Sequence, residues 1–137
     1  MMFEFHPHTA DIRMRVEAPT LVKIYEAALL GMAEILKEGL CKDESNFDLE
    51  STIEIESKDN TCLLIDFLSE VLAHSYAEKA VYCRLEIQEL QDNKLKVTLF
   101  GKHIDSLDEE IKAVTYHEAL LIKNNNDQWE TFIIFDI

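Results

Sequence analysis

Glycine and proline are scarce in this sequence, which contains 3 glycines and 2 prolines among 137 residues. Few positions therefore interrupt regular structure, and flexible linkers rich in these residues are not expected. No apolar run approaches the roughly 20 residues that a helix needs to cross a bilayer. The first residues also lack the basic and apolar regions of a signal peptide. These absences predict a cytoplasmic protein that does not insert into a membrane.

Cysteine is sparse as well. The 3 cysteines are Cys41, Cys62 and Cys83, and no two of them form a C-x-x-C pair. This spacing indicates neither a zinc ribbon nor a disulfide framework. We therefore predict that all three are reduced and pack as small apolar residues.

Basic residues are few relative to acidic ones: 13 Lys and Arg stand against 27 Asp and Glu, for a formal net charge of −14. Nucleic-acid binding usually requires a basic surface that displaces phosphate counterions, so direct binding to nucleic acid or to an anionic membrane is disfavoured. A basic protein partner or a cation fits this charge better. Solubility alone would also explain it.

Common catalytic signatures are missing, including a glycine-rich phosphate loop, G-x-S-x-G and H-E-x-x-H. The composition, with 47% hydrophobic and 29% charged residues, is that of a folded domain with a real core. The length suits one domain over residues 1–137.

The apolar periodicity predicts an α+β fold. Alternation in Asp11–Ala18 indicates a half-buried strand. Helical spacing predicts a helix over 21–38, with Thr20 as N-cap and Gly39 as C-cap, and a second helix that starts after Asp59 or Asn60 and runs to about 79. The second helix has a stripe of Leu63, Leu64, Phe67, Leu68, Val71, Leu72 and Ser75. Further strands are expected over 51–57, 81–90, 95–100, 113–122 and 129–135. This order predicts a two-layer sandwich in which two main helices pack on a mainly antiparallel or mixed sheet.

Two histidines and an aspartate stand close together near the N-terminus. In an extended chain His6 and His8 point the same way, and Asp11 could join them on a metal ion. Hydrogen-bonding turn residues are the alternative interpretation of both histidines.

The C-terminal strand places two carboxylates side by side. Asp136 shares a face with Phe132 and Ile134, and the terminal carboxylate of Ile137 follows it. Held close together in partly apolar surroundings, the two groups would repel unless a cation lay between them. Hard divalent cations prefer such oxygens. A frayed end with both charges in water is the alternative.

A third group comprises Lys112, just ahead of an expected strand, and His117 within that strand. A solvated lysine and a hydrogen-bonded strand histidine are the simpler interpretation of these two residues.

Taken together, these motifs resemble the archease family. The chain has H-T-A-D-[IV] as His8-Thr9-Ala10-Asp11-Ile12, K-A-V-T-Y-H as 112–117, and a final D-I as Asp136-Ile137. Its second predicted helix is similar to the family segment L-L-x-x-[WF]-L-x-E, here at Leu63, Leu64, Phe67, Leu68 and Glu70. Many relatives have an acidic residue before H-T-A-D, where this chain has Pro7.

The resemblance implies an accessory protein for an RNA ligase of the RtcB type, which joins tRNA halves in tRNA splicing. Family members promote guanylylation of the ligase and its multiple turnover without performing ligation, so the chain is not expected to be an enzyme and no catalytic residue is assigned. By motif, Asp11, Asp136 and Ile137 match a divalent-metal site, with Ca²⁺ expected and Mg²⁺ or Mn²⁺ as alternatives. Lys112 matches a position linked to activation of the ligase. His8 and His117 lie in the same motifs and would support the site without binding the metal.

Two other functions are compatible with the residues. A small metal-dependent hydrolase or lyase would use His6, His8 and Asp11. A protein chaperone or scaffold would need no metal.

Overall fold

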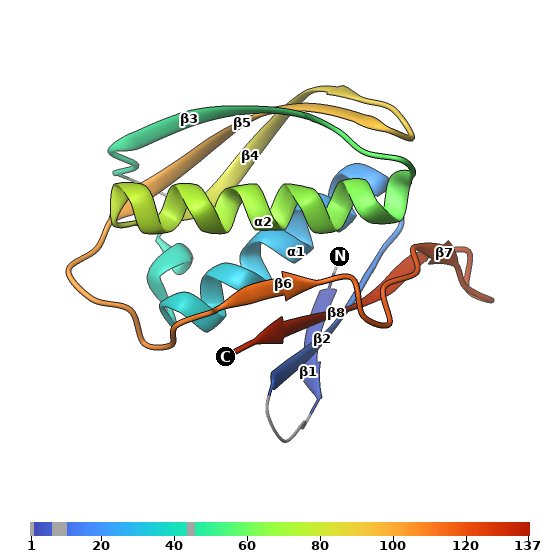
Figure 1. Ribbon diagram of the computed structural model, residues 1–137, viewed down its shortest axis with the longest axis horizontal. Coiled ribbons are helices and arrows are strands. Elements are labelled where there is room, and N and C mark those ends of the chain that lie inside the picture. The colour runs from blue at the N-terminus through green and yellow to red at the C-terminus, as the bar shows by residue number, and fades with distance from the viewer. Residues whose placement is uncertain (1, 7–10, 44–45) are drawn as a thin grey trace.

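Two helices and eight strands are arranged in layers in the computed structural model, which describes residues 2–6, 11–43 and 46–137. Figure 1 shows both helices between two sheets. In chain order the elements are β1 (Met2–His6), β2 (Asp11–Ala18), α1 (Leu21–Leu36), the 3-10 helix η1 (Leu40–Lys42), β3 (Leu49–Glu56), α2 (Asn60–Glu78), β4 (Ala80–Leu90), β5 (Lys94–His103), β6 (Ala113–Thr115), β7 (Ile122–Lys123) and β8 (Trp129–Asp136).

Both sheets are antiparallel. The first has the order β1-β2-β8-β6, with β7 also paired to β8, and the second has the order β3-β5-β4. Helix α1 contacts β2 in one sheet and β4 in the other, while α2 contacts β6 in one sheet and β3 and β4 in the other. The predicted α+β sandwich of two helices on antiparallel strands is confirmed. Its division into two sheets was not evident from the sequence pattern.

The helices begin where the sequence indicated. The Thr20 side chain accepts a hydrogen bond from the backbone N–H of Lys23, and Asp59 does the same for Cys62, so both N-cap predictions are confirmed. The predicted end of the first helix is wrong. Helix α1 stops at Leu36, and Gly39 instead takes a left-handed conformation (φ 78°) that starts η1.

The core lies between the sheets and around the helices. The predicted α2 stripe is confirmed, because all seven of its residues are buried. In β2, Met14, Val16 and Ala18 have no exposed surface, so this face of the strand points into the core. Helix α1 approaches that face closely, since a Cβ on Gly31 would lie 2.2 Å from the Met14 sulfur.

Two strand predictions differ from the structure. The strand expected over 113–122 is broken into β6 and β7, because residues 116–121 leave the sheet in a turn where Glu118 has a left-handed φ of 60°. The prediction that His117 lies within a strand is therefore wrong. Strand β1 was not predicted, and it pairs with β2 in the register Phe3↔Val16. No helix in the described ranges is long and apolar enough to cross a membrane.

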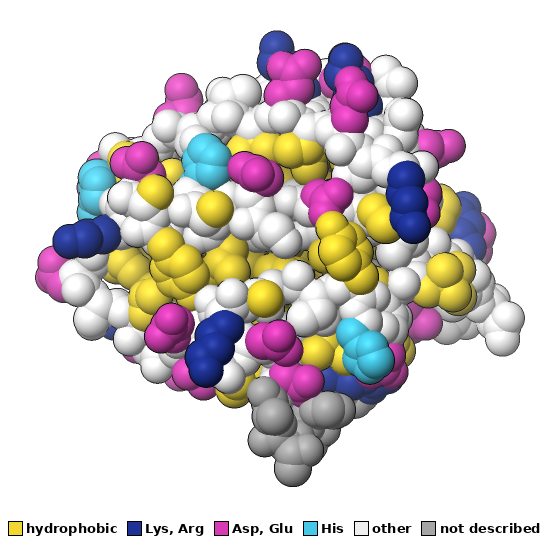
Figure 2. All heavy atoms as spheres, in the orientation of Figure 1, with side chains coloured by type: hydrophobic (Ala, Val, Ile, Leu, Met, Phe, Trp, Pro, Cys, Tyr) yellow, Lys and Arg dark blue, Asp and Glu magenta, His cyan; other side chains and the backbone are white. Residues whose placement is uncertain are grey.

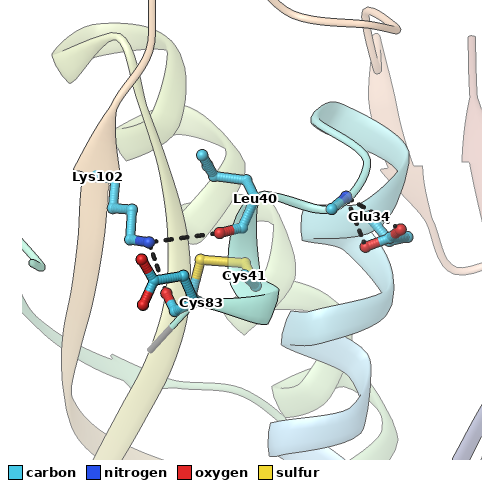
Figure 3. Close-up of a disulfide and its surroundings, with 7 residues drawn as sticks. Glu34, Leu40, Cys41, Cys83 and Lys102 are labelled. Carbon is cyan, nitrogen blue, oxygen red and sulfur yellow. Dashed lines mark hydrogen bonds between the residues drawn. A yellow bond between two sulfur atoms is a disulfide. The ribbon is translucent and has the colours of Figure 1, made fainter. Parts of the chain in front are cut away.

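The prediction of three reduced cysteines is wrong for two of them. Cys41 and Cys83 form a disulfide between η1 and β4, with their Cα atoms 5.3 Å apart, and Cys62 is a free thiol. Figure 3 shows Lys102 beside this bond, where its amino group donates to the carbonyl oxygens of Leu40 (3.4 Å) and Asp43 (2.6 Å). The cysteines are far apart in sequence, so their spacing gave no signal for this pairing.

Candidate carboxylate site at the end of β8

The pairing of β2 with β8 brings Asp11 and Asp136 together. The two residues are register partners in this antiparallel pair, and directly opposite side chains share one face of a sheet. Met14 and Val16 point into the core, so Asp11, at an odd-numbered position, faces the outside of the sheet. The Asp136 side chain is exposed, whereas Oδ1 of Asp11 is shielded from solvent. Two residues 125 positions apart thus share one small patch.

The end of the chain is held beside this pair. Ile137 follows the last residue of β8, and its side chain packs, partly buried, against the core. Among the described side chains, no three His, Cys, Asp or Glu groups are close enough to hold a metal ion. A cation at Asp11 and Asp136 would therefore need further oxygen ligands, and the carboxylate of Ile137 is the next one along the chain. This set of hard oxygen donors fits Ca²⁺ or Mg²⁺.

The backbone of Lys112 contacts the strand that carries Asp136, and the residue also borders a hollow beside α2. Its N–H donates to the carbonyl oxygen of Asp136 at 2.7 Å, which extends the pairing of β6 with β8. The Lys112 side chain is exposed and lines a hollow against α2 together with Leu72 and Tyr76. The structure thus places Lys112 between the candidate site and the surface of α2.

Of the three candidate histidines, the structure describes the side chain of His117 alone. His117 is exposed in the turn that follows β6. The backbone of His6 pairs with that of Arg13, two residues from Asp11. His8 lies outside the described residues, as does the side chain of His6. The hydrolase or lyase hypothesis requires the side chains of His6 and His8, which lie outside the described part of the chain, so it stays a hypothesis.

One cationic group beside the aspartates was not predicted. Arg13 shares the outer face with Asp11, and its guanidinium lies 3.7 Å from the centre of the Phe132 ring and 3.5 Å from Glu118. This stacking holds the positive charge over Phe132 of β8 and beside Glu118 in the turn after β6. The strand alternation in the sequence could have identified Arg13 as a neighbour of Asp11, but not its partners on β8 and in the turn.

The turn that carries His117 is attached to α2. The Tyr116 hydroxyl donates to Asp66, which also accepts from Ser57. The hydrogen bond to Asp66 is the largest cause of a raised Tyr116 pKa, to about 12, because ionisation of the phenol would break that bond beside a carboxylate.

Tyr116→Phe is expected to destabilise the fold by roughly 1 kcal/mol, since solvent weakens a charge-assisted hydrogen bond at this exposed residue. A tyrosine whose pKa is raised in the folded state adds its full stabilisation at pH values below the ordinary tyrosine pKa. That stabilisation is lost as the pH rises through the raised pKa of the folded state. The difference between wild type and Tyr116→Phe should therefore be constant up to pH 10 and vanish near pH 12. Urea unfolding at pH 7 to 12 measures it, and a pH-independent difference would contradict this assignment.

The chain resembles known proteins over almost its whole length. The model of the archease protein family matches residues 3–137. A protein archease from Thermococcus gammatolerans is 30% identical over 142 residues, which cover 98% of each chain. One from Methanosarcina mazei is 26% identical and covers 98% of this chain and 95% of its own.

Solved structures agree on the fold. The solution structure of Methanobacterium thermoautotrophicum protein 1598 has a TM-score of 0.77 at 27% identity and covers 98% of both chains. The crystal structure of an archease from Thermotoga maritima, described as a possible chaperone, has a TM-score of 0.60 at 24% identity over 95% of this chain and 93% of its own. The family model and these relatives cover the motifs at both ends of the chain and the strands that pair them, and this chain belongs to the archease family.

Proposed function

We propose that this protein activates an RNA ligase of the RtcB type in tRNA splicing by promoting guanylylation of the ligase and so its multiple turnover. The protein itself performs no ligation. One observation carries the proposal: Asp11 and Asp136, which match the metal positions of the family, are register partners on β2 and β8. Membership in the archease family supports the same role.

A divalent cation belongs to this proposal. Asp11, Asp136 and the carboxylate of Ile137 would hold it, with Ca²⁺ expected and Mg²⁺ or Mn²⁺ as alternatives. When bound, the ion would neutralise the carboxylates and offer positive charge at the protein surface. The chain itself holds the aspartates in register, packs Ile137 against the core and places Lys112 next to Asp136.

The charge of the protein suits a protein partner. A net charge of −14 attracts a basic, RNA-binding ligase and raises the rate of encounter more than the final affinity. The same charge disfavours direct contact with RNA. We infer that the protein meets RNA only through the ligase, in the cytoplasm.

Adding this protein below the ligase concentration is expected to increase product beyond one turnover per ligase, because an activator is released and acts again. The measurement follows joining of cleaved tRNA halves with GTP and a divalent metal, and it follows the guanylylated ligase in parallel. Bovine serum albumin at the same concentration is the control. Product that stays at or below one turnover would contradict the activator role.

A further inference from the structure

One hollow of this protein is lined by a reactive bond. Figure 2 shows a different surface, between α2 and the segment that leads into β6, where hydrophobic side chains gather and charged groups of both signs surround them. Groups of both signs do not select a ligand. The hollow beside α1, by contrast, has a volume of about 310 Å³ and is lined by Cys41 and Cys83, the two residues of the disulfide. We call it the disulfide hollow.

The rest of the disulfide hollow is mostly apolar. Its other lining residues are Glu26, Leu29, Leu30, Phe47, Arg84 and Leu85. Arg84 is already paired with Glu86 at 2.6 Å, and Glu26 has the opposite charge, so electrostatics does not choose what enters. What the hollow presents to a small molecule is the disulfide itself, between leucine and phenylalanine side chains.

The two cysteines of the bond differ in how accessible they are. Cys83 lies on β4 and is 7% exposed, whereas Cys41 is partly exposed on η1. Figure 3 shows the bond reaching from η1 to β4. In thiol–disulfide exchange a thiolate attacks one of the two sulfurs, and the rate depends on access to that sulfur. Cys41 is therefore the residue that an incoming thiol reaches, and Cys83 is the leaving group.

A disulfide with this access is suited to reversible chemistry. In the cytoplasm, where we propose that the protein acts, the disulfides that occur are usually transient and are catalytic or redox-sensing. We infer that the Cys41–Cys83 bond is a reversible modification site for a low-molecular-weight thiol of the glutathione class, which enters through the disulfide hollow. This inference goes beyond activation of a ligase, and its chemistry needs no ligase.

The exchange is balanced in atoms and electrons. The thiolate sulfur of the small thiol forms a bond to Sγ of Cys41, and the bond between Cys41 and Cys83 breaks. Sγ of Cys83 leaves with the electron pair and takes a proton from water. The product is a mixed disulfide on Cys41 with Cys83 as a thiol, and attack by the Cys83 thiolate on Cys41 restores the original bond and releases the small thiol. The ratio of thiol to disulfide in the surroundings therefore sets how firmly η1 is tied to β4.

Reduced glutathione is expected to open the bond in the folded protein, because the disulfide hollow already admits it. The measurement uses Cys62→Ser, which removes the free thiol. The rate of opening, followed by acid quenching, alkylation and mass spectrometry, should rise in proportion to glutathione concentration. A rate that levels off at the rate of global unfolding, measured by hydrogen exchange in β2, would mean that the bond is reached only in the unfolded chain and would overturn the inference.

Two single-cysteine proteins test which sulfur is attacked. In the Cys62→Ser background, Cys83→Ala leaves the thiol of Cys41 and Cys41→Ala leaves the thiol of Cys83. Both lack the disulfide, so each is the matched control of the other. With oxidised glutathione, Cys41 should form the mixed disulfide at least about tenfold faster than Cys83, because reaction at a thiol follows its exposure. Equal or reversed rates would contradict the assignment of Cys41.

Filling the disulfide hollow tests the path of entry. Leu30→Trp places a larger side chain in its wall and should slow opening by glutathione at least about tenfold. Ala77→Trp, at an exposed position of α2, is the matched control and should react like the parent protein. Circular dichroism confirms the fold of both variants. Equal rates in all three proteins would exclude the hollow as the path.

A protein thiol is the competing ligand. If thioredoxin, a protein dithiol, opened the bond while glutathione did not, the assignment to a small thiol would be wrong. Each of these measurements uses the protein without the RNA ligase. A failure of this inference therefore leaves the proposed function standing, and a failure of ligase activation leaves the exchange chemistry to be judged by these rates.

Discussion

Asp11→Asn and Asp136→Asn are each expected to abolish the thermal stabilisation of this protein by Ca²⁺. The wild type at a free Ca²⁺ concentration of 100 times its dissociation constant should gain about 2.7 kcal/mol of folding stability, because the proposed site exists only in the folded chain. For a domain of this size that corresponds to a rise in Tm of about 10 °C. An amide in place of either carboxylate removes a charged ligand at nearly constant shape, so each variant should shift by less than about 2 °C.

When the ion is removed, the stability difference between each of these variants and the wild type is expected to reverse its sign or vanish. Two like charges directly opposite each other in an antiparallel pair destabilise it by up to about 1 kcal/mol. With EDTA present, each variant should therefore be as stable as the wild type or slightly more stable. Asp92→Asn, at an exposed position in the β4–β5 turn, is the matched control, and it should retain the full response to Ca²⁺. Differential scanning calorimetry with Ca²⁺ and with EDTA measures all four proteins.

The carboxylate of Ile137 can be tested without removing its side chain. One glycine added after Ile137 moves that carboxylate away and leaves the packing of Ile137 against the core in place. This extended protein should lose most of the Ca²⁺ response and most of the ligase activation. If both aspartate variants and the extended protein activated the ligase normally, the metal site would have no part in the mechanism.

Local signals in the sequence predicted most of the helices and strands. The apolar stripe of α2 and the alternation of β2 depend on neighbouring residues, and so do the caps at Thr20 and Asp59. The division of the strands into two sheets depends on which strands pair. Alternation shows which face of a strand is buried but not which strand lies beside it. The break between β6 and β7 also escaped prediction, because the turn at 116–121 is fixed by distant contacts such as Tyr116 with Asp66.

The candidate site shows the same limit. The family motifs make Asp11 and Asp136 candidate metal ligands, and composition or spacing could not have brought the two residues together. Their meeting follows from the β2–β8 register, in which eight residue pairs from Asp11↔Asp136 to Ala18↔Trp129 are aligned. The stacking of Arg13 on Phe132 is another consequence of that register, since Phe132 lies on β8. A family motif can thus point to a residue as a candidate ligand, but only the strand pairing shows which residues lie beside it.

Reducing the Cys41–Cys83 disulfide is expected to lower the free energy of unfolding by about 4 kcal/mol. The bond joins residues 42 positions apart, and closing a loop of that length restricts the unfolded chain by roughly this amount at 25 °C. The comparison should use Cys62→Ser, which removes the free thiol and prevents exchange. Urea unfolding with and without dithiothreitol measures the difference. A second variant with both Cys41→Ala and Cys83→Ala, added to that background, is the control and should not respond to dithiothreitol.

Below the conditions that unfold the whole protein, reduction of the disulfide should loosen the structure on only one side of the molecule. The disulfide ties η1 to β4, and the Lys102 bonds to Leu40 and Asp43 hold only the same segment. Hydrogen exchange in residues 37–43 and 46–48 should therefore accelerate on reduction, while β2 and β8 stay protected. Because the carboxylates lie on the sheet that the disulfide does not join, the response to Ca²⁺ and ligase activation should be equal in both redox states. Unchanged stability on reduction would instead mean that both cysteines are thiols in solution, as their spacing had suggested.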